Sequence, residues 1–101
     1  MRPVSVPLTF RRLALAEFYD AVDWYEQRSA GRGSTFLGAV RKILLEIAGA
    51  PDGYPEVHED VREAAVPGFP YAAYYRIEPR RVHVLAVFHM SRDPTEWQSR
   101  V

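Results

Sequence analysis

The 101-residue sequence contains no cysteine, which excludes a disulfide framework and any metal site built on thiolates. It has no apolar segment of membrane-spanning length, and the residues after Met1 lack the continuous apolar run of a signal peptide. We therefore expect a cytoplasmic protein without a membrane partner. Glycine-rich phosphate loops and nucleophile elbows are also missing. The 48% of apolar residues predicts one folded domain over residues 1–101.

An excess of charge of either sign is missing as well. Thirteen basic and thirteen acidic residues give a formal net charge of zero, whereas proteins that hold nucleic acid through many phosphates carry a basic surplus. Lys42 is the single lysine, so almost all the basic residues are arginine. This balance predicts no broad nucleic-acid-binding surface, although a small arginine cluster could still hold one phosphate.

Hydrophobic periodicity predicts two helices and four strands. The first helix spans residues 11–29, and the second follows Ser34 as its N-cap and stops at Gly49. Alternating apolar residues bounded by turn formers predict strands at 4–10, 61–66, 71–77 and 82–89.

These elements predict an α+β fold in two layers, in the order β-α-α-β-β-β. Each helix is apolar on one side only, so a helical hairpin should pack on one face of a small, mostly antiparallel sheet. Residues 51–60 are predicted to be a polar connection, and residues 94–100 can form a last helical turn that carries Trp97. The position of the first strand in the sheet stays open.

Alternation within the last two predicted strands assigns side chains to the two faces of the sheet. The charged Arg76 marks its own face as the one away from the helices, and Tyr74 shares that face. On the next strand, His83 and His89 lie together on the less apolar side. We therefore expect Tyr74, Arg76, His83 and His89 to look out from one open face, which Arg62 could join.

Several short segments follow one another in an informative order. They are Trp24-Tyr25-Glu26, then Phe36 and Ala50-Pro51 at the bounds of the second helix, then Val61-Arg62, Phe69-Pro70-Tyr71 and Tyr75-Arg76-Ile77, and finally His89-x-x-Arg92-Asp93-Pro94 with Trp97. In this order and spacing, the sequence resembles the RelE/ParE superfamily of toxins from bacterial type II toxin–antitoxin systems over nearly its whole length. The resemblance implies a RelE/ParE-like fold and a partner antitoxin that wraps the toxin and silences it.

The resemblance implies either of two targets. RelE-like members cut messenger RNA on the ribosome, whereas ParE-like members poison DNA gyrase. The ending around His89 and Arg92 is more similar to the ParE-named side and its plasmid-stabilisation relatives. Where RelE-like nucleases place basic residues between the second helix and the sheet, this sequence has Asp52, Glu56, Glu59 and Asp60. We predict a ParE-like growth inhibitor acting on gyrase; the alternatives are a ribosome-dependent mRNA endoribonuclease and a non-toxic binding member.

For the nuclease alternative, the catalytic candidates are His89, Arg62, Arg76 and Arg92. Metal-free RNA cleavage needs a base and an acid that work near neutral pH, with positive charge beside the phosphate, and imidazole and guanidinium groups supply these. Tyr74 could then orient or stack on a base.

A structural interpretation competes with each catalytic candidate. His89 can cap the last strand by bonding a backbone group, and Arg92 can pair with Asp93 or Glu96. Arg62 and Arg76 can be cross-strand partners of Glu63 or Glu78. Exposed pairs of this kind contribute only about 0–1 kcal/mol, so stability alone would not demand them.

Three further residues are candidate contacts to a target, namely Tyr74, His83 and Trp97. Aromatic side chains dominate binding hot spots, which favours Trp97 as an anchor. The run His58-Glu59-Asp60 lacks the ligand spacing of a metal site. We expect neither a metal nor a cofactor.

Overall fold

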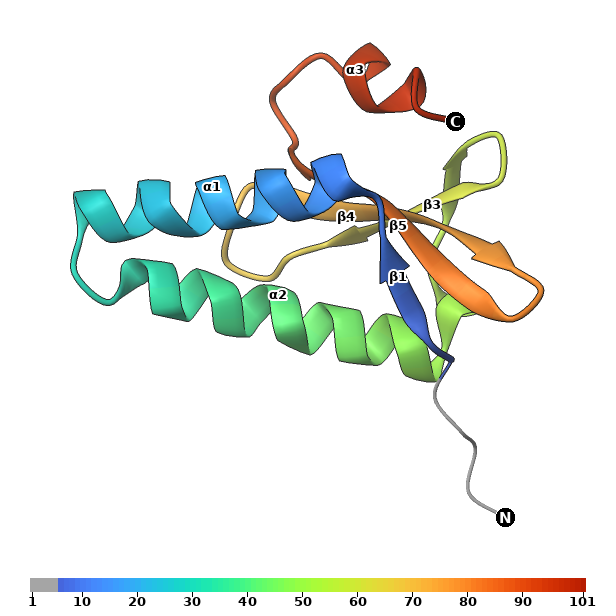
Figure 1. The fold of residues 1–101 in the computed structure, drawn as a ribbon, viewed down its shortest axis with the longest axis horizontal. Helices are drawn as coiled ribbons and strands as arrows, with labels where there is room; N and C mark the ends of the chain where they lie inside the picture. The colour runs from blue at the N-terminus through green and yellow to red at the C-terminus, as the bar shows by residue number, and fades with distance from the viewer. Residues whose placement is uncertain (1–5) are drawn as a thin grey trace.

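The computed structural model describes residues 6–101 as two packed layers (Figure 1). Two long helices, α1 (Arg12–Arg28) and α2 (Arg32–Gly49), form a hairpin over one face of a five-stranded sheet. A 3₁₀ turn (Pro51–Gly53) follows α2, and the short helix α3 (Thr95–Gln98) lies near the C-terminus. The strands are β1 (Leu8–Phe10), β2 (Glu56–His58), β3 (Val61–Ala65), β4 (Tyr71–Glu78) and β5 (Arg81–His89). No described helix is long and apolar enough to cross a membrane.

The sheet has the strand order β1-β5-β4-β3-β2 and is mostly antiparallel, with β1 parallel to β5. This arrangement confirms the predicted α+β fold class, and it places the first strand at the edge beside β5. Val4 and Ser5, which the prediction included in that strand, lie outside the described residues. Within the described part the strand begins at Leu8.

β2 is a strand that the sequence prediction missed, because residues 56–58 were assigned to a polar connection. Two of its three side chains are exposed, so the alternation that marks a half-buried strand is weak. It pairs with β3 through Glu56 opposite Arg62, and the tight turn between them places Glu59 at a positive φ of 51°. Backbone pairing with β3 therefore makes this segment an edge strand despite its polar composition.

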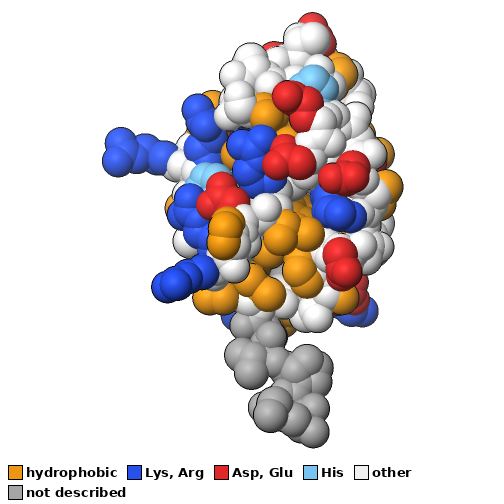
Figure 2. All heavy atoms as spheres, turned by 90° about the vertical axis from the view of Figure 1, so that its right-hand side faces the viewer, with side chains coloured by type: hydrophobic (Ala, Val, Ile, Leu, Met, Phe, Trp, Pro, Cys, Tyr) orange, Lys and Arg blue, Asp and Glu red, His pale blue; other side chains and the backbone are white. Residues whose placement is uncertain are grey.

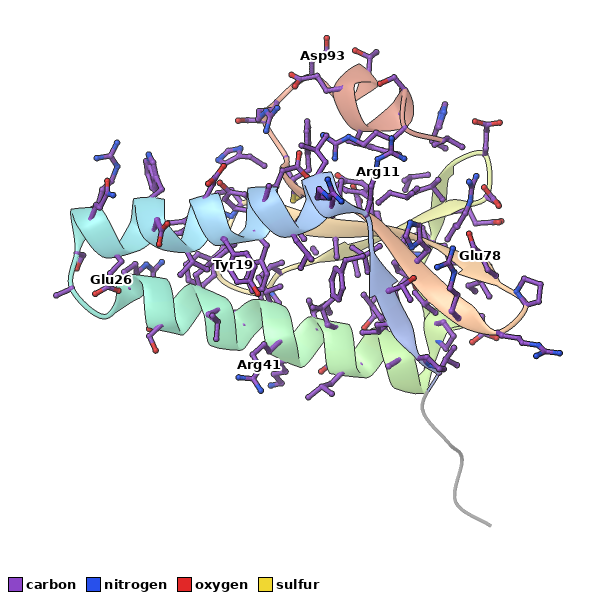
Figure 3. All side chains as sticks on the ribbon, viewed as in Figure 1. Arg11, Tyr19, Glu26, Arg41, Glu78 and Asp93 are labelled. Carbon is purple, nitrogen blue, oxygen red and sulfur yellow. The ribbon has the colours of Figure 1, made fainter. Side chains whose placement is uncertain are left out.

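The turn between the helices differs from the prediction, because α2 begins at Arg32 and not after Ser34. Gly31 adopts a left-handed φ of 87°, which glycine allows without strain. The carboxylate of Glu26 then accepts the backbone N–H groups of Gly31 (2.9 Å) and Gly33 (3.0 Å), and Figure 3 shows Glu26 at this turn. A side chain of the preceding helix thus caps α2, in place of the local N-cap that we expected.

The core between helices and sheet is fully apolar apart from one hydroxyl. Phe36, Val40 and Ile47 of α2 are completely buried and belong to the same cluster as Tyr75 of β4. The Tyr75 hydroxyl donates to the Pro51 carbonyl at 2.5 Å, and burial raises the pKa of Tyr75 to about 12. The connection after α2 is thereby fastened to the middle of the sheet.

A β-bulge in β5 overturns the predicted alternation of that strand. Tyr75 lies opposite Val84 but Tyr74 lies opposite Ala86, so the pairing skips Leu85. A bulge inserts one extra residue and reverses the alternation beyond it. Consequently Val87 and His89 point towards the helices, and the prediction that His89 shares a face with Tyr74, Arg76 and His83 was wrong.

The reverse face of the sheet, opposite the helices, is also less open than predicted. A second apolar cluster covers its centre, and Trp97 of α3 is 2% exposed there. Its ring stacks on that of Tyr74 at 4.2 Å between centroids. The predicted helical turn at the C-terminus therefore exists and closes part of the face that we expected to be free.

Replacing Gly33 by alanine tests the close approach of the two helices. A Cβ at this position would lie 2.6 Å from the carbonyl oxygen of Val22, and overpacking of this kind costs about 1–3 kcal/mol. Gly38→Ala on the same helix is the matched control, because a Cβ there meets nothing within 4 Å and should raise stability by up to about 1 kcal/mol. Urea unfolding measures both, and equal effects of the two substitutions would contradict this packing.

Candidate functional site

The described residues form a groove of about 600 Å³ between α1 and the sheet. Its floor is apolar, with buried Ala21 and Val87, and its walls carry aromatic rings. Trp24 lies on the rim and is 48% exposed. The lining residues are Glu17, Asp20, Ala21, Trp24, Tyr25, Pro70, Tyr71, Val87, His89, Ser91 and Arg92. A concave surface of this size, mostly apolar with a few polar groups, is the usual form of a binding site.

His89 lies in this groove because of the bulge. Its ring meets the Tyr71 ring edge-on at 5.0 Å. The backbone N–H of Ser91 donates to Nδ1 at 3.1 Å, and the Ser91 hydroxyl lies 2.7 Å from the same nitrogen. A nitrogen that accepts a backbone N–H carries no proton, so the neutral ring bears its proton on Nε2. The groove therefore receives a hydrogen-bond donor, and the expected alternative, that His89 bonds a backbone group at the strand end, is confirmed.

Arg92 is placed by two contacts on the far side of the groove wall. Its guanidinium forms an ion pair with Glu96 and stacks over the Phe88 ring at 4.2 Å. Pairing with Glu96 was one of the alternatives that the sequence offered. The side chain is 46% exposed, so a partner in the groove can still reach it.

A largely buried ion pair connects the groove to the C-terminus. Arg100 grips the Glu17 carboxylate with both terminal nitrogens, at 2.7 and 3.0 Å, and the two side chains are only 8% and 11% exposed. Arg100 also donates to the Leu85 carbonyl, and Glu17 accepts the Val87 N–H. The first of these backbone groups belongs to the bulged residue Leu85, and the second lies two residues further along β5. The pair therefore satisfies polar groups that the bulge removes from the sheet.

The predicted target contacts Tyr74 and Trp97 do not look out of the molecule. Tyr74 is 4% exposed, and its hydroxyl donates to Glu63 at 2.7 Å. Burial, followed by this hydrogen bond, raises the pKa of Tyr74. Because the two rings stack against each other under the C-terminal segment, the expectation of an open aromatic surface was wrong.

The remaining candidates fall into two groups on opposite faces. Arg62 lies opposite Tyr75, on the helix side, and donates to the Tyr54 carbonyl at 2.6 Å. Arg76 lies opposite His83 on the reverse face and forms an ion pair with Asp60 at 2.8 Å. The predicted partners of these arginines, Glu63 and Glu78, were therefore wrong. The sheet separates Arg62 and His89 from Arg76 and His83.

The groove was not identifiable from the sequence. Glu17, which lines the groove, is 83 residues from its ion-pair partner Arg100. Neither residue stands in a recognisable sequence pattern. His89 and Arg92, which line the groove, were candidates from the sequence, but no pattern placed them beside Trp24 of α1. Among residues 6–101, no three histidine or acidic side chains are grouped to hold a metal ion.

Known proteins match this chain in sequence family and in fold. The family model described as the ParE toxin of the type II toxin–antitoxin system parDE matches residues 8–94. A chain of the chromosomal ParDE system from P. aeruginosa has a TM-score of 0.76 at 15% identity, covering 86% of this chain and 98% of that chain. A double arginine mutant of E. coli toxin RelE in the free state has a TM-score of 0.69 at 20% identity, covering 96% and 94%. No curated protein matches in sequence. At these identities the two structures establish the fold.

Removing Arg100 tests the role of the buried pair. Arg100→Ala leaves the Glu17 carboxylate buried without its partner, which typically costs about 3–5 kcal/mol. Arg92→Ala is the matched control, because its exposed pair with Glu96 contributes less than about 1 kcal/mol. Urea unfolding of both variants measures the difference. A small, equal loss for both would show that the pair does not hold the C-terminal segment.

Proposed function

The chain belongs to the ParE toxin family of type II toxin–antitoxin systems, and from this premise we propose that it is a growth inhibitor that acts on DNA gyrase. A cognate antitoxin neutralises it. The protein acts by contact with its target and not by cleaving RNA. The fold is common to ParE and RelE toxins, so the choice between the two targets depends on the side chains.

The observation that carries this choice is the division of the nuclease candidates between the two faces. General base, acid and phosphate-stabilising groups must lie within hydrogen-bond reach of one reacting phosphate. His89 instead lies on the helix side with Nδ1 engaged by Ser91, and Arg76 lies on the reverse face with Asp60. This separation supports a mode of action that needs no catalytic constellation.

The groove beside α1 is the place where we expect the antitoxin to bind. Trp24 presents a large aromatic surface at its rim, which Arg28 supports from one side at 4.0 Å. Aromatic anchors beside a dry apolar floor are typical of binding hot spots. An amphipathic helix or an extended segment of the partner could fill the groove with apolar side chains, and the exposed carboxylate of Asp20 favours a basic residue at its edge.

Induced expression of the chain alone tests the target. We expect growth arrest, inhibition of supercoiling by purified gyrase, and intact messenger RNA, because no cleavage site is assembled. Mapping of RNA ends in the same cells provides the comparison. New ends within translated messages that disappear in His89→Gln or Arg62→Ala would establish the RelE-like alternative, and unaffected growth would establish a non-toxic binding member.

Substitution of Trp24 tests the groove as the antitoxin site. Trp24→Ala should weaken binding of the cognate antitoxin by tenfold or more, as expected for loss of an aromatic hot spot worth about 2 kcal/mol. Tyr19→Ala is the matched control, since Tyr19 is an exposed aromatic residue of the same helix outside the groove. Titration calorimetry measures both affinities. Equal affinities would place the partner elsewhere, without bearing on the gyrase proposal.

A further inference from the structure

A row of polar side chains crosses three strands on the reverse face, away from the groove. Thr9 of β1 lies opposite His83 of β5, which lies opposite Arg76 of β4. Neighbouring strands are about 4.8 Å apart, so these side chains are in contact range. Arg81 precedes His83 by two residues in β5, so alternation puts it on the same face. Arg11 follows the end of β1, and its charge acts on the His83 imidazole. We call Arg11, Arg76, Arg81 and His83 the arginine–histidine cluster.

The donors of this cluster are only partly used by the protein. Arg76 gives one N–H to Asp60 at 2.8 Å, Arg81 gives one to Glu78 at 2.6 Å, and Arg11 gives one to the Arg100 carbonyl. A guanidinium has five N–H donors. Arg76 Nε is buried and has no hydrogen-bond partner. The exposed guanidinium groups of Arg11 and Arg81 thus keep N–H groups that can bind a ligand.

His83 lies at the centre of the cluster, and the pKa of its imidazole depends on the surrounding charges. Thr9 Oγ1 lies 2.7 Å from His83 Nδ1, which leaves Nε2 for another partner. Burial lowers the pKa of His83, and Arg81, Arg11 and Arg76 lower it further, while Glu78 opposes them. Asp60 and Glu59 face Arg76 from the β2–β3 turn. At the imidazole, the effect of the three arginines exceeds that of the nearby carboxylate.

Stability does not explain why these like charges are gathered. The pairs Arg76–Asp60 and Arg81–Glu78 are solvent-exposed on at least one side, and exposed pairs contribute little. A buried donor without an acceptor is unfavourable, as are neighbouring positive charges. Figure 2 shows both basic and acidic side chains around a histidine on one flank of the molecule. Gathering these like charges is unfavourable for stability, and the exposed guanidinium groups keep N–H donors. Both features indicate a site for an anionic ligand.

We propose that the arginine–histidine cluster is a binding site for a single phosphate group, supplied either by a nucleic-acid strand or by free phosphate. The planar arginine fork matches phosphate oxygens in a bidentate way, and His83 adds a further donor at its centre. The zero net charge of the chain restricts the contact to one phosphate. The site lies on the opposite face from the groove, and the proposal does not depend on the proposed function.

NMR titration of the histidine ring protons tests this site, with His58 and His89 as internal references. Sodium phosphate, compared with sodium chloride at equal ionic strength, should raise the pKa of His83 by about one unit or more, because a nearby anion favours the protonated ring. The shift should saturate. Arg81→Ala in β5 and Arg11→Ala between β1 and α1 should each weaken binding about tenfold or more. Arg41→Ala on the outer side of α2 (Figure 3) is the matched control and should leave it unchanged.

A second arm distinguishes the sources of the phosphate. If a nucleic-acid strand is the source, a short single-stranded DNA should shift His83 at lower concentration than inorganic phosphate. Its salt dependence should correspond to about one phosphate contact. If free phosphate is the source, the DNA should have the weaker effect. The proposal is overturned if neither ligand shifts His83 selectively, or if Arg81→Ala and Arg11→Ala bind as well as Arg41→Ala.

Discussion

The buried pair between Glu17 and Arg100 is the interaction on which the rest of the structure depends. It joins the first helix to the C-terminal segment, and it binds the carbonyl of the bulged residue Leu85 and the N–H of Val87 in β5. Two buried charges are stable only when well paired and fully hydrogen-bonded, and here the fork geometry and the two backbone contacts meet that requirement. The bulge can therefore persist in a central strand where it would otherwise leave unpaired polar groups.

The bulge in turn decides what each face of the sheet can do. Because it reverses the alternation after Val84, His89 enters the groove beside α1 and Phe88 joins the apolar cluster on the other side. Trp97 belongs to the C-terminal segment that Arg100 holds in place, and its ring packs on that cluster. The molecule consequently has an apolar groove suited to a protein partner on one side. On the other, beyond the covered centre, it has a compact basic cluster.

The sequence predicted most of the fold because the signals for the long elements are local. The periodicity of α1 and α2 and the turn formers around β3, β4 and β5 are all visible within short windows. The cap of α2 was missed because Glu26 acts from the preceding helix. The site was largely missed because strict alternation cannot reveal a bulge whose stabilising partners, Glu17 and Arg100, are distant in sequence. The competing interpretations of His89 and Arg92 were correct since they involve neighbours within four residues.

The bulge in β5 and the groove beside α1 both require the His89 ring to lie on the helix side of the sheet. Nuclear Overhauser contacts from the His89 ring protons can be measured in the free protein. If β5 is bulged, the His89 ring should show contacts to the Tyr71 ring, whose centroid lies 5.0 Å away, and none to Tyr74 or Arg76. Contacts from His89 to Tyr74 or Arg76 would show that β5 has no bulge and that His89 lies on the reverse face of the sheet.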